Sequence, residues 1–553
     1  MRFLPVVLLL ACASPRSSPR NPEARTRLVV VIVVDQFRAD YLTRFAPRFL
    51  APSASSPGGY RFFTERAAYW PFARYDLLQA MTGPGHATVL TGSYPYRNGI
   101  SLNAWCTTDA KGRTRTVYCV QDEAEPLVGG NPPLRPNDPE VVCEEASDPG
   151  VSPRKLQGGT VGDALKLAGH PARVVAIALK DRAAVPLGGH LADLALWFDQ
   201  QQFHWISSKY YLPSGQLPDW VAQLNSRLDA RRGEPVRFAS EGPGTGLTGG
   251  TFELGRRFGE KSALRTPLGI SLTVDAALAA LSALDLGRGA GPDLLAISLT
   301  SHDWVGHDLG PNRREMEEMT VAEDREIERL LSGIAARLPG GLDEAVIALT
   351  GDHGIAPSPA YLRGLGRDSS LSGYIDAPRV VARAEAGLIR RYGPPAGGAW
   401  ISGTAELNFW LNDVSVSAKK LVRDDAAREL RELIAAAMPE AAFVFTRADV
   451  VARRVPGGAL GEHILRGYRE GQGGDVVAIP KPWFTVSGDV TSHMTDYLYD
   501  VTVPLAIAAP RLVPGTYAED AHVVDLAPTL AFLLGIVPPD LNEGRVLSEA
   551  VRR

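Results

Sequence analysis

Several runs of this chain are continuously apolar and rich in β-branched residues, and they constrain the fold more than any other feature. RLVVVIVVD near residue 30, DLLAISLT near residue 296 and EAVIALTGD near residue 348 show no alternation of apolar and polar side chains. Strands with this pattern are buried on both faces, as in a parallel sheet that is covered by helices on its two sides. The sequence therefore predicts a central sheet that is mostly parallel.

Helical patterns separate these runs. VGDALKLAG, VDAALAALSALDL and the long amphipathic MEEMTVAEDREIERLLSGIAARL each precede a strand-like run, and VVDLAPTLAFLLGI forms a last helix after the strand VPLAIAAP. This alternation predicts an α/β fold with helices on both faces of the sheet. The 553 residues are 45% hydrophobic, which is enough for a large core, and a net charge of −4 gives no basic surface for nucleic acid.

Two regions interrupt the alternation of strands and helices. Residues from about 197 to 265 are rich in glycine and aromatic side chains, and residues from about 360 to 487 carry elements of their own, such as AELNFWLN and AARELRELIAAAMP. We expect one domain over residues 27–553, with these two regions as insertions. The second insertion separates His353 from His493 and is expected to form a cap.

The N-terminal segment over residues 1–26 has the pattern of an export signal followed by a flexible tether. Arg2 precedes FLPVVLLLACA, which is too short to span a bilayer. The sequence LLAC resembles a bacterial lipobox, in which Cys12 would be the lipidated first residue and would attach the protein to a membrane. Cleavage near Ala13 without lipidation is the alternative. Either reading predicts an exported bacterial protein, periplasmic or anchored to a membrane as a lipoprotein.

Export permits disulfide bonds, and three cysteines follow Cys12 in the sequence. WCTTDAKGRTRTVYC is typical of a hairpin, and a turn centred between Gly112 and Arg113 places Cys106 opposite Cys119. The sequence thus predicts a bond between Cys106 and Cys119, with Cys143 free.

Carboxylates and imidazoles follow the three apolar runs. Asp35 ends the first run, Asp303 and His307 follow the second, and Asp352 and His353 follow the third. Because the carboxyl ends of parallel strands meet at one edge of a sheet, we expect these side chains to converge. Asp303 and His307 are four residues apart, so they share one face of a helical turn.

One further histidine, His493, lies in the polar loop SGDVTSHM before a late strand. Three carboxylates and three histidines suit two Zn²⁺ ions about 4 Å apart, because Zn²⁺ accepts mixed nitrogen and oxygen ligands. Taken singly, each residue is more simply a cap or a hydrogen-bonding side chain, so the interpretation depends on the ordered set. Four other histidines are interpreted as structural: His86, His302, His463 and His522.

MTGPGHATVLTGSYP places Thr82 at a Gly/Pro turn before a predicted helix, whose N-terminus would favour phosphate. Metal coordination would turn this weak hydroxyl into a nucleophile, and a simple N-cap is the alternative. The amide of Asn103 could donate to a phosphate oxygen, or belong to an ordinary loop. Lys180 and Arg182 alternate at the end of a strand in IALKDR, so both could point into one cleft and bind a phosphate dianion. A solvated strand end is the alternative for this pair.

These motifs, in their order along the chain, resemble the alkaline phosphatase superfamily, in particular the branch with nucleotide pyrophosphatases/phosphodiesterases and PafA-type alkaline phosphatases. The matching segments are VVDQFRADYL, TGPGHATVLTGSYPYRNGI, LNAW, LKDR, SHDWVGHDLGP, TGDHG and SHM. The resemblance implies two zinc ions. Their ligands would be Asp303, His307 and His493 for one, and Asp35, Asp352, His353 and the Thr82 oxygen for the other.

The resemblance also implies a reaction, in which Thr82 attacks phosphorus and forms a phosphothreonine. Asn103, Lys180 and Arg182 would contact the phosphate oxygens, and diesterase relatives lack the Lys/Arg pair. The chain is thus expected to hydrolyse small phosphate monoesters. LNAWC departs from the family pattern beside Asn103. A phosphodiesterase or phospho-headgroup transferase, and a non-catalytic metal- or phosphate-binding lipoprotein, are the alternatives.

Overall fold

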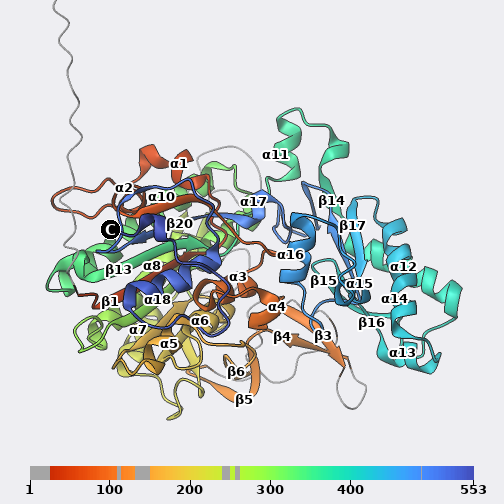
Figure 1. The fold of residues 1–553 in the computed structure, drawn as a ribbon, viewed down its shortest axis with the longest axis horizontal. Helices are drawn as coiled ribbons and strands as arrows, with labels where there is room; N and C mark the ends of the chain where they lie inside the picture. The colour runs from red at the N-terminus through yellow and green to blue at the C-terminus, as the bar shows by residue number, and fades with distance from the viewer. Residues whose placement is uncertain are drawn as a thin grey trace, which may run out of the picture.

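The computed structural model describes residues 25–108, 114–130, 143, 150–238, 250–255, 262–486 and 488–552. The predicted export signal and Cys12 lie outside these residues. An 11-stranded sheet forms the centre of the molecule (Figure 1). In spatial order its strands are β21 (Gly515–Thr516), β2 (Ala68–Arg74), β20 (Thr502–Ala508), β13 (Ala345–Gly351), β1 (Leu28–Val34), β12 (Asp293–Leu299), β7 (Val174–Ala178), β8 (Leu194–Asp199), β9 (His204–Ser208), β5 (Gln121–Val128) and β6 (Gly150–Val151).

The middle of this sheet is parallel, as the sequence predicted. β13, β1, β12, β7 and β8 are neighbours that run in one direction. The apolar runs near residues 30, 296 and 348 are β1, β12 and β13. Their last residues pair in register, with Val34 opposite both Leu299 and Gly351. The loops after these strands therefore leave the sheet at the same edge.

Helices cover both faces of the sheet, and β1 shows why. Val29, Val31 and Val33 pack into one apolar cluster, and the alternate residues pack into a second cluster on the opposite face. This confirms the predicted α/β layers. Helices on the first face are α3 (Thr82–Thr91), α5 (Val161–Leu167), α6 (Asp181–Gly188) and α18 (Leu526–Leu534); helices on the second are α2 (Tyr60–Arg66), α8 (Pro267–Ala283) and α10 (Arg314–Arg337).

Residues 359–486 form a second lobe beside the sheet, drawn in cyan and light blue in Figure 1 and here called the cap. It has apolar clusters of its own, built around side chains such as Phe409 and Leu430. Its four-stranded sheet is antiparallel and contains β15 (Ile401–Ala405), β16 (Asn408–Leu411), β18 (Val476–Pro480) and β17 (Ala441–Thr446). The other elements are α11 (Pro359–Gly364), β14 (Gly373–Ile375), α12 (Ala377–Tyr392), α13 (Asp413–Ala418), α14 (Arg423–Ala437), α15 (Arg447–Val451), α16 (Ala459–Gly467) and β19 (Phe484–Val486).

The region from 197 to 265 joins the main sheet through its first strands. Residue 197 lies within β8, which pairs with β7 and β9. Beyond β9 the region adds α7 (Asp219–Ala230), β10 (Pro235–Phe238) and β11 (Gly250–Glu253). Among the helices of the described ranges, none has both the length and the apolar character needed to cross a bilayer.

The disulfide prediction is wrong. Two strands form the expected hairpin, β3 (Ala104–Thr108) and β4 (Thr114–Tyr118). In this hairpin Cys106 lies opposite Thr116, because the paired residues centre closer to β3 than the assumed Gly112–Arg113 turn. Cys119 falls beyond the end of β4, is buried and takes no part in the disulfide. The bond joins Cys106 to Cys143, whose Cα atoms are 6.0 Å apart, and the Cys143 N–H donates to Thr116 Oγ1 at 2.9 Å.

We expect a non-reducing peptide map of the protein, alkylated after denaturation, to contain a linked peptide pair with Cys106 and Cys143. Cys119 should carry the alkyl group, because it is not part of the disulfide. The same map after reduction is the control, in which all three cysteines are alkylated. A linked pair that contains Cys119 would contradict the observed connectivity.

Candidate active site

The predicted metal-ligating residues lie together at the carboxyl edge of the parallel strands. Asp35 follows β1, and Asp352 and His353 follow β13. Asp303 and His307 lie on α9 (Ser301–Leu309), which begins just after β12. The side chains of Asp35, Asp303 and Asp352 are buried. The in-register ends of three neighbouring strands thus bring these carboxylates into contact range.

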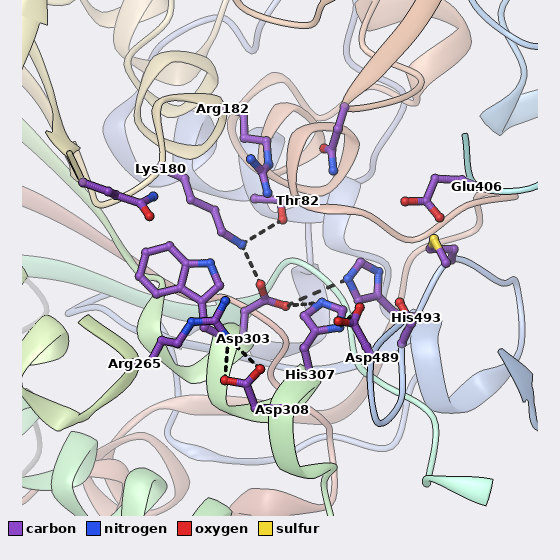
Figure 2. A pocket seen from close by; sticks show the side chains of 15 residues that line it. Thr82, Lys180, Arg182, Arg265, Asp303, His307, Asp308, Glu406, Asp489 and His493 are labelled. Atoms are coloured by element: carbon purple, nitrogen blue, oxygen red, sulfur yellow. Dashed lines mark hydrogen bonds and ion pairs between the residues drawn. The ribbon is translucent and has the colours of Figure 1, made fainter. Parts of the chain in front are cut away.

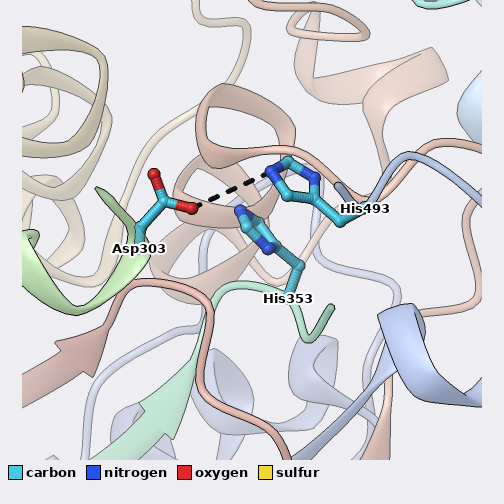
Figure 3. A group of neighbouring side chains, drawn as sticks. All are labelled: Asp303, His353 and His493. Carbon is cyan, nitrogen blue, oxygen red and sulfur yellow. Dashed lines mark ion pairs between the residues drawn. The ribbon is translucent and has the colours of Figure 1, made fainter. Parts of the chain in front are cut away.

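Two groups of side chains have the spacing of metal sites. Ligand atoms of Asp303, His353 and His493 lie within 4.8 Å of one another, as Figure 3 illustrates, and so do those of Asp35, Asp352 and His353. His307 joins the first group, with Nε2 3.2 Å from Asp303 Oδ1. The structure thus gathers all six predicted side chains. His353 faces both groups, whereas the resemblance assigned it to one ion.

Three histidines are fixed with the same ring nitrogen toward the carboxylates. His307, His353 and His493 each have Nδ1 within hydrogen-bond distance of a backbone carbonyl oxygen, at 3.1, 2.9 and 2.6 Å. A carbonyl only accepts, so Nδ1 carries a proton in each ring, and Nε2 presents a lone pair whenever the ring is neutral. Histidines that bind metals are commonly oriented by such a bond from the other ring nitrogen. The arrangement therefore suits three imidazole ligands.

Lys180 is the cation between the carboxylates. Its Nζ donates to Asp35 Oδ2 at 2.8 Å. Figure 2 shows its other two contacts: Nζ donates to Asp303 Oδ2 at 2.7 Å and lies 3.4 Å from Thr82 Oγ1. Burial and the charge of Asp352 raise the pKa of Asp35 well above its usual value, although Lys180 opposes this. Burial also acts to raise the pKa of Asp303, but Lys180 and His307 outweigh it and hold that pKa well below the ordinary range.

Several atoms of the cluster lack a partner in the described part of the chain. Asp35 Oδ1 and His353 Nε2 are buried and have no hydrogen bond. Asp352 Oδ2 has none either, although it lies 3.1 Å from Nδ1 of the neighbouring His86. Buried acceptors without partners are costly, and a divalent cation would satisfy all three. Nitrogen and carboxylate ligands in a tight group fit Zn²⁺.

Burial lowers the pKa of both His353 and His493, so both favour the neutral form that a metal requires. His307 differs: burial acts to lower its pKa, but Asp303 raises it to about 10. A cation that binds His307 must therefore displace a proton from it.

Thr82 is the first residue of α3, and its side chain faces the same pocket. The helix is capped at Met81 without a side-chain hydrogen bond, so the structure does not support the N-cap alternative for Thr82. The next amide, Gly83 N–H, donates to Asn103 Oδ1 at 2.8 Å, which leaves the Asn103 NH₂ group as a donor. At Gly85, a Cβ atom would lie 2.5 Å from the backbone oxygen of Asp352, so only glycine allows α3 to approach that loop.

Lys180 and Arg182 both line the pocket, but not as alternating strand residues. β7 ends at Ala178, and α6 begins at Asp181. Lys180 therefore precedes the helix and Arg182 lies in its first turn. Arg182 Nη1 is 3.4 Å from the hydroxyl of Tyr118, which donates to Asp181 at 2.5 Å. Both side chains reach the pocket because α6 starts soon after β7. The predicted route, two alternate residues of an extended strand, is not the one observed.

The pocket between these residues has a volume of about 160 Å³. Several residues that line the pocket were not among the predicted site residues. Gln200 directly follows β8 and is buried, and its Oε1 has no hydrogen-bond partner in the described ranges. Its position at a parallel strand end was the available signal. Other residues that the sequence analysis missed are Arg265, Trp304, Asp308, Glu406, Asp489, Ser492 and Met494.

Charged side chains of both signs line the pocket (Figure 2). Lys180 and Arg182 lie on one side, next to Thr82, and Glu406 of the cap lies on another. Arg265 is held by both carboxylate oxygens of Asp308 at 2.5 Å. The cap therefore contributes directly to the site, at a position that hydrophobic periodicity could not reveal.

The sequence profile of the type I phosphodiesterase / nucleotide pyrophosphatase family matches residues 29–390. The chain belongs to this family. Alkaline phosphatase PafA of Elizabethkingia meningoseptica is 27% identical and covers 96% of both chains. A crystal structure of wild-type PafA, 26% identical, superimposes with a TM-score of 0.81 and covers 96% of this chain and 99% of its own. A Myroides odoratus protein named calcium-transporting ATPase is 28% identical, over 96% of this chain and 95% of its own. The resemblance to the PafA-type branch of the alkaline phosphatase superfamily is thus confirmed.

A cluster of charged residues joins the cap to the two loops that carry Thr82 and His493. His463, on α16 of the cap, lies with Nε2 3.6 Å from Asp76 and Nδ1 3.3 Å from Asp496. Arg466 and His522 contact the same Asp76 carboxylate, each at 2.8 Å. Burial acts to lower the pKa of His463, but Asp496 and Asp76 raise it to about 9.

We expect His463→Gln to destabilise the protein in a pH-dependent way. The raised pKa means that the charged form of His463 stabilises the folded state fully below about pH 6.5, and that this is lost as pH rises through about 9. The difference in unfolding free energy should be roughly 1–2 kcal/mol at pH 6, allowing for partial solvent screening. Calorimetry at pH 6 and pH 10 measures it.

The same substitution at His204, which pairs with Asp229 away from the cap, is the control and should change stability little. If His463→Gln lowers the free energy of unfolding equally at pH 6 and pH 10, packing and not charge holds α16 in place.

Proposed function

We propose that this chain is a zinc-dependent phosphate monoester hydrolase that acts through a phosphothreonine. The observation that carries the proposal is the common orientation of His307, His353 and His493, whose Nε2 atoms face buried carboxylates beside the Thr82 hydroxyl. The similarity to PafA over nearly the whole chain supports the same reaction class.

The six clustered side chains would hold two zinc ions. Asp303, His307 and His493 would bind one, and the other would be bound by Asp35, Asp352 and His353 together with Thr82. Zinc supplies Lewis acidity, which polarises phosphoryl oxygens and lowers the pKa of a bound hydroxyl or water.

The residues of the chain provide the remaining steps. Thr82 Oγ1 attacks phosphorus and forms a new P–O bond, while the ester oxygen leaves with its bonding electrons and takes up a proton. Water then attacks the phosphothreonine, so that phosphate leaves and the Thr82 hydroxyl is restored. Lys180, Arg182 and the Asn103 NH₂ group would contact the phosphate oxygens, and the positive end of α3 would favour their charge.

A small monoester suits the pocket. Its volume of about 160 Å³ is small, and Lys180 and Arg182 line it together with Thr82. A dianionic phosphate offers both cations a charged oxygen, whereas a diester carries one negative charge less. A PafA variant with a threonine, an asparagine, a lysine and an arginine replaced has also been solved, at a TM-score of 0.80. The same four residue types meet in this pocket.

A phosphodiesterase or nucleotide pyrophosphatase is the second candidate, and the name of the matching family favours it. The metal ligands would be the same in both cases. The difference lies in Lys180 and Arg182, because a diester has no second charged oxygen for them to bind.

The proposed enzyme is exported, either as a lipoprotein through Cys12 or after cleavage near Ala13. The disulfide between Cys106 and Cys143 supports an oxidising compartment. Small phosphate esters outside the cytoplasm would be its substrates.

We expect Thr82→Ala to bind zinc with nearly normal stoichiometry and to lose at least about 10³-fold in kcat, since the nucleophile is gone. Thr82→Ser is the matched control, because it keeps the hydroxyl and should retain much of the activity. Mass spectrometry of acid-quenched enzyme should find phosphate on residue 82 in the wild type and in Thr82→Ser, and none there in Thr82→Ala. Turnover by Thr82→Ala within a few-fold of wild type would exclude Thr82 as nucleophile.

We expect zinc-loaded enzyme to prefer p-nitrophenyl phosphate strongly over bis-p-nitrophenyl phosphate in kcat/KM. Arg182→Ala should lower kcat/KM for the monoester by about 10- to 100-fold, because one charge-assisted hydrogen bond is lost. It should lower kcat/KM for the diester much less. Lys180→Ala should show the same selectivity, but zinc content must be measured because Lys180 also contacts Asp35 and Asp303. A diester preference of the wild type would favour the second candidate, and equal losses on both substrates would exclude the phosphate contact.

A further inference from the structure

Gln36 lies two residues after the end of β1, in a strained backbone conformation. It follows Asp35, is fully buried and has a φ of +66°. Residues other than glycine rarely adopt this region, and those that do are held there by their surroundings. Gln36 is therefore fixed by contacts that outweigh the local strain.

Those contacts join two carboxylates that come from different elements. The backbone N–H of Gln36 donates to Asp352 Oδ1 at 2.9 Å, and its side-chain Nε2 donates to Asp303 Oδ1 at 2.6 Å. Asp352 follows β13, and Asp303 lies on α9. One residue thus holds a carboxylate of each proposed metal group.

The orientation of Asp303 is defined from both sides. Gln36 donates to its Oδ1, and Lys180 donates to its Oδ2 at 2.7 Å. With both oxygens occupied, the carboxylate cannot rotate without the loss of a bond, so Oδ1 stays directed toward His307, whose Nε2 is 3.2 Å away.

α9 is shaped to accept the Gln36 amide. A Cβ atom at Gly306 would lie only 1.7 Å from Gln36 Oε1, so any larger residue at Gly306 would displace the amide. Gln36 Oε1 itself is buried and has no hydrogen-bond partner in the ranges that the structure describes. An apolar side chain of the same size would avoid this unsatisfied oxygen, so stability alone does not explain a glutamine here.

We propose that Gln36 is a positioning residue for the metal centre: it sets the orientation of Asp303 and the separation between Asp303 and Asp352. The inference rests on the proposed two-metal function. Carboxylates that bind metals depend on such outer hydrogen bonds, and their removal typically weakens metal affinity. Gln36 acts through the ligands and does not touch the substrate.

The test is zinc titration of metal-free enzyme in competition with a chromogenic chelator, for the wild type and Gln36→Met. Methionine keeps the size of the side chain and the backbone N–H to Asp352, and removes the donor to Asp303. We expect the zinc site of Asp303 to weaken roughly 10- to 100-fold, and the site of Asp35 and Asp352 to keep its affinity. At saturating zinc, kcat should fall while KM changes little, because the substrate contacts remain.

Gly306→Ala gives an independent second variant, since the added methyl group would displace the Gln36 amide while Gln36 itself is unchanged. It should show the same selective loss of zinc affinity. The double variant Gln36→Met/Gly306→Ala should be no weaker than either single variant, because both remove one interaction. Gln472→Met, in the cap, is the matched control and should bind zinc as the wild type does.

Melting of the metal-free proteins separates positioning from packing. We expect metal-free Gln36→Met to melt near the wild-type temperature, because the bond lost to Asp303 is offset by removal of the unsatisfied Gln36 Oε1. Gly306→Ala should melt somewhat lower, because its methyl group crowds a buried amide. Wild-type zinc affinity in Gln36→Met, or a loss shared equally by both zinc sites and accompanied by a lower melting temperature, would overturn the inference. A wild-type protein that binds no zinc would instead overturn the proposed function on which the inference rests.

Discussion

Three carboxylates, Asp35, Asp303 and Asp352, are buried within a few ångströms of one another at the ends of adjacent strands, and their mutual repulsion must be balanced for the chain to fold. Lys180 balances part of it, because its ammonium group donates to two of the three. The pKa of Asp35 is still raised by burial and by Asp352. The cluster therefore has a deficit of positive charge, and divalent cations are the species that fit its size and its donor atoms.

The fold sets this proximity before any metal binds. Neighbouring strands are roughly 4.8 Å apart, so residues that follow β13, β1 and β12 in register are within reach of one another. A further proposed ligand, His493, comes from a loop that returns from the cap. His463 and Arg466 on α16 contact Asp76, before Thr82, and His463 also contacts Asp496, in the loop of His493, so they link the cap to the proposed metal site.

The sequence was sufficient for the features that depend on strand ends. Continuous apolar runs predicted the parallel strands, and the residues after them predicted the cluster, because a parallel sheet leaves little freedom there. Features that depend on register or helix starts were not predictable in this way. The hairpin pairs Cys106 with Thr116, so the disulfide partner of Cys106 is Cys143 and not Cys119. α6 begins at Asp181, so Lys180 and Arg182 reach the pocket from a helix start and not from a strand end. Gln36 lay beside a predicted ligand, but its φ and its bonds appear only in three dimensions.

The same ligand set can serve monoesters and diesters, so specificity within this family must come from residues outside it. In this chain the inner wall of the pocket presents Lys180 and Arg182, and the cap presents Glu406. Under the proposed function, the two cations would match the charge of a terminal phosphate. Because the proposed metal ligands follow core strands or lie on α9 and in the His493 loop, and Glu406 lies on the cap, contacts to the leaving group can change through the cap while the proposed metal site stays the same.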